Sequence, residues 1–137
     1  MSAEILIETI LNDAVEALNL PHPVAYENTE IDWNLQVPFI RMYNQPTLKE
    51  QAACGETARN FHKGIFHIEV CHPGKGGVIK PKEIAALITP SFKRGTHLIS
   101  GTDEIICEKC AIQTAYVENS WYILPIFVFY YTYCVFF

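Results

Sequence analysis

The sequence predicts an α+β fold: an antiparallel or mixed sheet of about five strands, packed by an N-terminal helix and a second short helix. Three observations lead to this class. The chain opens on a helical stripe of apolar residues, later segments alternate as strands do, and the elements follow the order α-β-β-β-α-β-β. The 137 residues suit one core, so we expect a single domain spanning 1–137.

The first element is expected to be a helix over residues 3–18. Ser2 suits the N-cap position, and Asn19 and Pro21 mark the end. Apolar residues fall on one stripe and polar residues fall opposite, as in a helix with one buried face. The apolar set is Ala3, Ile7, Ile10, Leu11, Ala14 and Leu18, and the polar set is Glu8, Thr9, Asn12, Asp13 and Glu16.

Extended segments follow the first helix. Residues 23–28 and 37–44 are expected to be strands, and the polar stretch 45–60 resembles a mobile connection or the frayed start of a strand. Residues 63–72 alternate, with Phe66, Ile68 and Val70 on one face and His67 and Glu69 on the other, which predicts a half-buried strand.

The second half continues with the loop "HPGKGG" (72–77) and a short helix over 81–88, which begins at a proline. Strands are expected over 101–113 and 120–133. The last strand is apolar on both faces, so the core must cover one face and a helix or a neighbouring subunit must cover the other.

Composition and charge narrow the function. A formal net charge of −5 argues against binding nucleic acid by neutralising phosphates. The longest apolar run, 121–131, is too short for a membrane-spanning helix, which needs about 20 residues. We expect no signal peptide, because the first residues carry acids instead of a basic segment and an apolar run. The five cysteines are therefore expected to be reduced thiols, as in a cytosol.

Cys107 and Cys110 have the C-x-x-C spacing of half a zinc site or of a redox dithiol. On a regular strand, residues three apart point to opposite faces with their Cα atoms about 10 Å apart. We therefore expect Cys107 and Cys110 to be ordinary strand residues, and metal binding and redox chemistry remain the alternatives.

Other short patterns give weaker signals. "HPGKGG" lacks the Ser or Thr of a phosphate-binding loop, and we expect a solvated loop. Cys134 to Phe137 match a prenylation box without a polybasic run before it, and we expect a buried strand end instead. No acid or serine lies at motif spacing from the histidines, which gives a hydrolytic triad no support. The histidines are His22, His62, His67, His72 and His97.

Five segments, in this order, resemble the tail-terminator (tail-completion) proteins of long-tailed phages. The segment "VPFIRMYN" is similar to the family's "P-y-L-R-v" strand, and "FKRGTHL" is similar to its "F-p-r-G-T-r-L" exit from the second helix. The other three segments are "PVAYEN", "HKGIFHIEVCHPGKGG" and "WYILPIFVFYY", and the resemblance covers nearly the whole chain.

The resemblance implies a structural virion protein without enzymatic activity or cofactors. Such proteins form a six-fold ring that caps the head-proximal end of the tail tube, stops tube polymerisation and joins the head connector. The implied partners are identical copies, the major tail tube protein and the head-completion or connector protein. DNA would pass through the lumen without specific binding, and the implied place is the neck region of the virion tail, after assembly in the host cytoplasm.

Two kinds of segment are candidates for these contacts, namely the polar connections between strands and helices and the aromatic last strand. Loops carry recognition, so docking to the tube and neck is expected at the segments 45–60 and 74–80. Aromatic residues are enriched in interface cores, so the ring contact is expected on the last strand. The docking candidates are Gln45, Lys49, Glu50, Glu56, Arg59, Lys75 and Lys80, and the ring candidates are Tyr130, Tyr131, Tyr133 and Phe136.

Three rival interpretations remain open. The chain could be another neck or head-closure subunit of a phage particle, which the sequence hardly distinguishes from a terminator. It could be an enzyme or small-molecule-binding domain, although no convergent catalytic set is visible. It could be a zinc module built on Cys107 and Cys110, in which case the purified protein would hold stoichiometric zinc.

Overall fold

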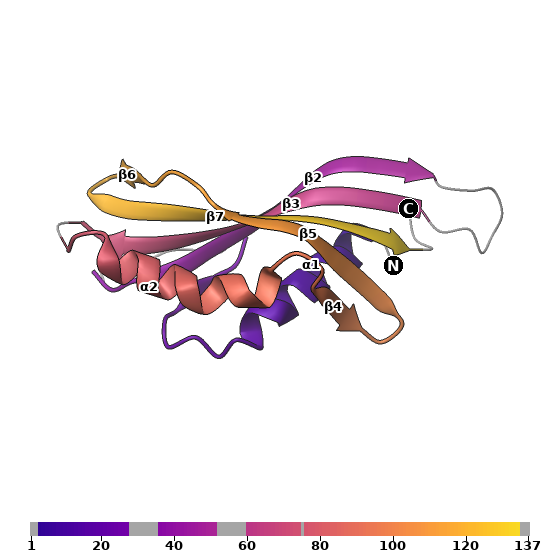
Figure 1. The fold of residues 1–137 in the computed structure, drawn as a ribbon, viewed down its shortest axis with the longest axis horizontal. Coiled ribbons are helices and arrows are strands. Elements are labelled where there is room, and N and C mark those ends of the chain that lie inside the picture. The colour runs from indigo at the N-terminus through magenta and orange to yellow at the C-terminus, as the bar shows by residue number, and fades with distance from the viewer. Residues whose placement is uncertain (1–2, 28–35, 52–59, 75, 135–137) are drawn as a thin grey trace.

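A curled mixed sheet with helices on one face forms the centre of the protein, as the computed structural model shows (Figure 1). The structure describes residues 3–27, 36–51, 60–74 and 76–134. The α+β class is confirmed. The helices are α1 (Ala3–Glu16), α2 (Ile79–Ile88) and the short 3-10 helix η2 (Thr89–Phe92), and the strands are β1 (Val24–Ala25), β2 (Phe39–Gln51), β3 (Asn60–Pro73), β4 (His97–Ser100), β5 (Asp103–Ile112), β6 (Tyr116–Glu118) and β7 (Trp121–Cys134).

The strand order is β1-β2-β3-β7-β5-β4, and β6 pairs with one end of β7 outside this path. Only the contact of β1 with β2 is parallel, and the other pairings in the described part are antiparallel. The strands β3 and β7 are 14 residues long and pair along their whole length. These two strands form the centre of the sheet, and at about 3.3 Å per residue each spans roughly 45 Å.

Both predicted helices are present. The helix α1 ends at Glu16, and Asn19 follows with a φ of 49°, the left-handed conformation that asparagine tolerates at a helix end. The helix α2 begins at Ile79, before the predicted start, and Pro81 fits its first turn because the N–H groups there have no partner within the helix.

The core lies between the helices and one face of the sheet. It contains Leu11 and Val15 of α1, Ile88 of α2, and alternate residues of the central strands such as Ile68 and Ile126, each 2% exposed or less. Period-two alternation places Phe66, Ile68 and Val70 on this face, as predicted for 63–72. The prediction of a half-buried strand is wrong for residues 66–71, because His67, Glu69 and Cys71 on the other face are buried as well.

The predicted connection 45–60 is wrong in its first part. Residues 45–51 continue β2, and Gln51 pairs with Asn60 across the hairpin. The strand tolerates Pro46 because β1 pairs with β2 only near Ile40 and Arg41, so farther along β2 is an edge strand. Near Pro46 the register with β3 also shifts at a bulge.

Two short strands, β4 and β6, were not predicted, and β1 is much shorter than the predicted 23–28. The strand β6 has three residues that are all exposed, and in β4 only Leu98 is partly buried. Segments this short and exposed carry no hydrophobic alternation, so pairing with β5 and β7 defines them instead of a sequence pattern.

The prediction that Cys107 and Cys110 point to opposite faces is wrong, although both lie on a strand. A register shift between Cys107 and Lys109 inserts Glu108 as an extra residue, so Cys107 pairs with Tyr130 and Cys110 pairs with Val128. Since Tyr130 and Val128 share the core face, both cysteines return to that face.

Candidate functional site

The sheet face opposite the helices is the candidate site, and we call it the open face. No helix in the described part covers it. Its residues alternate with the core residues of β2, β3, β5 and β7, and aromatic side chains dominate the part carried by β3 and β7. The aromatic members are Tyr43, Phe61, His67, Phe127, Phe129, Tyr131 and Tyr133, with the buried pair Phe39 and Trp121 at the end near β6.

Ring contacts link these side chains across the strands. The ring of Tyr43 stacks on His67 with centroids 4.3 Å apart, and Phe127 meets the other side of His67 edge-on at 4.4 Å. Toward the chain's end, the rings of Phe61 and Tyr133 lie 5.0 Å apart. Aromatic pairs at these spacings stabilise a sheet surface and keep its side chains in place.

His67 lies between the rings of Tyr43 and Phe127, and only 6% of its surface is exposed. Its Nε2 lies 2.7 Å from Oε1 of Gln45, so a neutral ring with the proton on Nε2 donates a hydrogen bond there. Burial lowers the pKa of His67, and the nearby carboxylate of Glu69 partly opposes that shift. The ring is therefore neutral near pH 7, and the open face has no imidazolium charge at its centre.

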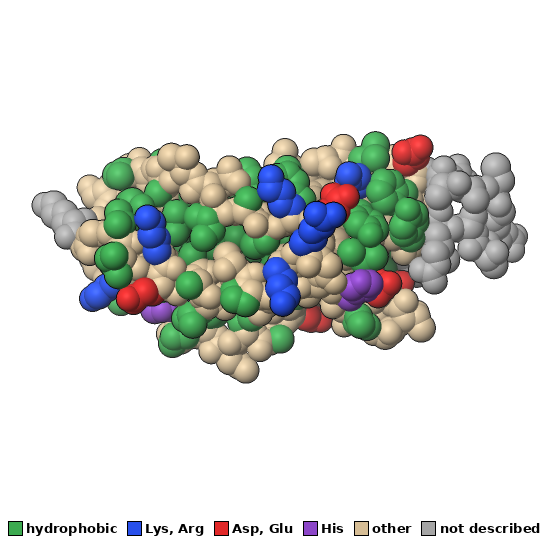
Figure 2. Space-filling model, in the orientation of Figure 1, with side chains coloured by type: hydrophobic (Ala, Val, Ile, Leu, Met, Phe, Trp, Pro, Cys, Tyr) green, Lys and Arg blue, Asp and Glu red, His purple; other side chains and the backbone are tan. Residues whose placement is uncertain are grey.

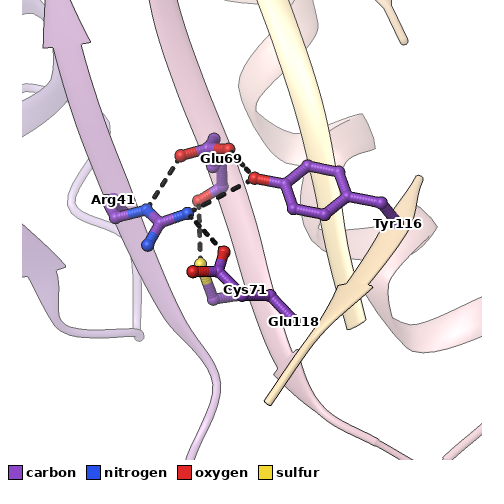
Figure 3. Close-up of polar contacts among 5 residues, drawn as sticks. All are labelled: Arg41, Glu69, Cys71, Tyr116 and Glu118. Carbon is purple, nitrogen blue, oxygen red and sulfur yellow. Dashed lines mark hydrogen bonds and ion pairs between the residues drawn. The ribbon is translucent and has the colours of Figure 1, made fainter. Parts of the chain in front are cut away.

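A polar cluster interrupts the apolar surface near β6 (Figure 3). The carboxylate of Glu69 accepts a hydrogen bond from Nε of Arg41 at 2.8 Å and another from the hydroxyl of Tyr116 at 2.6 Å. Glu118 lies 3.7 Å from the guanidinium on its other side. Because only 6% of the Glu69 side chain is exposed, these bonds compensate a charge that water scarcely reaches.

The cluster fixes the position of β6. Tyr116 and Glu118 belong to this short exposed strand, and their side chains reach across to β2 and β3 (Figure 3). Burial raises the pKa of Tyr116, and the hydrogen bond to Glu69 adds to the shift, so the hydroxyl remains a donor at neutral pH. The cluster therefore acts as a structural anchor between β6 and the strands β2 and β3.

The four ring candidates separate in the structure. The side chains of Tyr131 and Tyr133 lie on the open face, and Tyr133 is 47% exposed. Tyr130 is buried on the core face: it is 1% exposed and donates a hydrogen bond to Oδ1 of Asn44 at 2.6 Å inside the subunit. Successive strand residues point to opposite faces, which explains the split. Phe136 lies outside the described residues.

The docking candidates lie toward two opposite ends of the molecule (Figure 1). Lys49 and Glu50 are exposed near the hairpin end of β2 and β3, while Lys80 is exposed at the start of α2, beyond the other end of β3. Gln45 lies between these ends and bonds His67. The structure does not bring the candidates into one site, and Glu56, Arg59 and Lys75 lie outside the described residues.

Two hollows accompany these surfaces. One, of about 610 Å³, lies beside the end that holds Lys80 and is lined by His22, His72 and Glu83 among others. The other, of about 540 Å³, lies where η2 meets β5 and carries Lys93, Arg94 and Lys109 with Glu108. Figure 2 shows Lys and Arg side chains spaced among the green apolar surface on one side of the molecule.

Burial raises the pKa of Cys107 to about 11, and the neighbouring Cys110 adds to the shift. The Cys107 thiol is therefore protonated at neutral pH, where it is a weak nucleophile and metal ligand. Cys71, Cys107 and Cys110 are free thiols. In the described part, no group of three or more His, Cys, Asp or Glu side chains is arranged to hold a metal ion. Among the described helices, none has the length and apolar character needed to cross a bilayer.

Comparisons with known proteins now decide the family. A family model described as "Phage tail terminator protein" matches residues 6–130. The chain belongs to the phage tail terminator family. Terminators of this family are structural components of the virion tail, with contacts to tail and head-proximal proteins.

Solved structures agree with this terminator's fold. Eleven solved chains match it, and one of them superposes with a TM-score of 0.73 at 18% identity, covering 95% of each chain. At that identity the likeness shows the fold alone. A search of the curated proteins found no match.

Sequence reasoning found part of the terminator's open face and missed the rest. The alternation in 63–72 places His67 and Glu69 on the face away from the core, which the structure confirms. The partners Arg41 and Tyr116 were missed, because their strands reach Glu69 only through the order of the sheet. The charged string "FKR" at 92–94 was a possible signal for the cationic hollow, but it was read only as part of a family motif.

Proposed function

We propose that this tail terminator assembles as a six-fold ring that caps the head-proximal end of the tail tube, stops its polymerisation and presents the surface that joins the head. The observation that carries the proposal is the open face: in this family member helices cover one sheet face, and no helix of the described residues covers the aromatic face. The role is structural, with the chain acting as one unit over 1–137 and DNA passing through the lumen.

The open face suits a contact between copies. Tyr131 is partly buried and Tyr133 is 47% exposed, and both adjoin Phe61 on the neighbouring strand. Aromatic side chains lose little conformational entropy on binding and are enriched at interface cores. A contact between two different patches of the same chain closes into a ring when its rotation divides a full turn, and otherwise continues as a filament.

The two ends of the long β3–β7 pair suit two different partners. The hairpin end carries Lys49 and Glu50, and the opposite end carries Lys80 beside its hollow, so both ends stay accessible when the faces between them form the ring. One end would then contact the tube and the other the head connector. Such a ring docks on the tube through one end and presents a different surface at its other end. The next tube subunit cannot bind that surface, because it does not resemble the surface of a tube subunit, so tube growth stops.

An assembly assay in infected cells tests this division. Charge reversals at the hairpin end (Lys49→Glu with Glu50→Lys) and at the other end (Lys80→Glu) are compared with the wild-type chain. We expect one variant to give overlong tubes, because capping fails, and the other to give tails of normal length that do not join heads. Both variants producing the same defect, or neither producing one, would contradict the assignment of the ends.

A second assay tests the ring contact. The double variant Tyr131→Ser with Tyr133→Ser should form fewer rings, as measured by mass photometry with and without tail tubes. The matched control is Leu87→Ser, which removes a 56% exposed apolar side chain from α2 on the helical side. Equal ring formation by the double variant and the control would exclude the aromatic end of the open face as the contact. Rings found only at a neck position away from the tube end would identify a head-closure subunit instead.

A further inference from the structure

The hollow between η2 and β5 concentrates positive charge in an acidic chain. Three of the ten Lys and Arg residues line it, namely Lys93, Arg94 and Lys109, while the whole chain has a net charge of −5. The one acid in its lining, Glu108, also lies 3.6 Å from Lys63. Neither Lys93 nor Arg94 has an ion pair within the described part of the chain. Both side chains can therefore pair with an anionic group of another molecule.

The hollow is continuous with the open face. The Nζ atom of Lys109 lies 5.7 Å from the centroid of the Phe129 ring, which is one of the aromatic rings of the open face. Lys63 lies on the same face, where it pairs with Tyr131 across the strands. A partner that covers the open face at this end therefore also meets the cationic hollow.

The complementary charge lies on α1 of the same chain. Its exposed stripe carries Asp13 and Glu16, and no cation of the described part forms an ion pair with either. Both acids lie in the last turn of the helix, which has no basic residue. The helix dipole disfavours negative charge at that end, and within the chain only the hydrogen bond from Tyr26 to Glu16 is seen to offset this among the described residues.

We propose that the acidic end of α1 in one copy binds the cationic hollow of the next copy, as the polar part of the subunit contact. The inference rests on the proposed ring and names the two surfaces that meet in it. The two patches differ, as a head-to-tail ring requires, and their charges are opposite. Asp13 and Glu16 are three residues apart on the helix, so one face presents both carboxylates to Lys93 and Arg94 together.

A second copy fits the hollow better than nucleic acid does. DNA binding by phosphate neutralisation needs a surplus of positive charge over an extended surface. This hollow is small and has Glu108 in its wall, and the chain as a whole is acidic. Two carboxylates on one helix turn match such a small patch.

A charge-swap experiment on the full chain tests the proposal. Arg94→Glu and Asp13→Arg are made singly and together, and ring formation is measured by mass photometry across a salt series, with tail tubes present and absent. Asp13 is chosen because Glu16 also accepts a hydrogen bond from Tyr26 at 2.9 Å. Lys82→Glu, an exposed cation of α2 outside the hollow, is the matched control. Lys109→Glu is a second hollow variant in case Arg94→Glu does not fold.

Each single swap should weaken association by about tenfold or more, and the double swap should restore most of it, since opposite charges face each other again. The control should associate as the wild type does, and added salt should weaken the wild type more than the single variants. Single variants that associate like the wild type, or a double swap as weak as the singles, would overturn the proposal.

Two further outcomes separate this inference from the function on which it rests. If rings form and cap tubes regardless of the swaps, the charge pairing is wrong while the terminator ring stands. If the wild type stays monomeric even with tubes, the ring and the pairing both fail. If the wild type binds duplex DNA at physiological salt and Arg94→Glu loses that binding while keeping the ring, the hollow is a nucleic-acid site and the pairing is wrong.

Discussion

Replacing Arg41 by methionine removes the cation from the polar cluster and leaves the Glu69 carboxylate behind. The guanidinium Nε lies 2.8 Å from that carboxylate, whose side chain is only 6% exposed. Methionine keeps much of the side chain's bulk, so the substitution tests charge more than packing. A buried carboxylate without its cation is strongly disfavoured, and the free energy of unfolding should therefore fall.

The size of the loss follows from burial. Removing one partner of a fully buried ion pair costs roughly 3–5 kcal/mol. Arg41 is itself 22% exposed, so water can enter part of the vacated space, and we expect the low end of that range, about 3 kcal/mol. For a chain of this size, 1 kcal/mol corresponds to about 3 °C in Tm, so the midpoint should fall by about 9 °C.

Thermal and urea unfolding monitored by circular dichroism measure this effect. In the double variant Arg41→Met with Glu69→Met the orphaned charge is gone, and stability should return to within about 1 kcal/mol of the wild type. The loss of Tyr116's acceptor matters little there, since Tyr116 is 42% exposed and water can accept its bond. Lys82→Met, at an exposed cation, should change stability by less than about 0.5 kcal/mol. The reasoning is refuted if Arg41→Met behaves like this control, or if the double variant is as unstable as the single one.

Three further predictions concern packing and pH. Gly64→Ala should lower the free energy of unfolding by about 2 kcal/mol in urea titration, because an added Cβ would overlap the Tyr130 ring; an unchanged midpoint would contradict this. Burial and the nearby Glu27 carboxylate raise the pKa of Glu8, so the folded chain binds this proton more readily than the unfolded chain does. The contribution of Glu8 to stability should therefore rise as the pH falls from 7 toward 4.5. Glu8→Gln should be more stable than the wild type at pH 7, and that difference should shrink on acidification. Burial lowers the pKa of His67, so the unfolded chain takes up a proton first: its contribution to stability should fall as pH drops below about 6.5, and His67→Phe should remove that fall, as unfolding at a series of pH values would show.

Long, regular elements of this fold were predictable from sequence, and short or irregular ones were not. The helix α1 has a helical apolar stripe, β3 alternates, and β7 is a long apolar run rich in aromatic and β-branched residues, which is enough to place all three. The extension of β2 through Pro46 was not predictable, because proline is tolerated there only by an edge strand, and edge position depends on how the whole sheet is ordered. The strands β4 and β6 likewise depend on their neighbours.

Side-chain direction was the harder part of the site. The last strand is apolar on both faces, so the sequence offered no rule for separating the buried Tyr130 from the exposed Tyr133. One inserted residue, Glu108, brings Cys107 and Cys110 to the same face where opposite faces were expected, and nothing in the string "CEKC" marks a bulge. The partner of Glu69 was also beyond sequence reasoning, since Arg41 and Glu69 are 28 residues apart.

Electron cryomicroscopy of tail tubes with this terminator bound would show whether identical copies close a ring through the open face of the sheet. We expect a closed six-fold ring on one end of the tube, in which Tyr131 and Tyr133 of each subunit contact the next subunit. A bound terminator that is not a closed ring, or a ring in which these tyrosines face solvent, would contradict it.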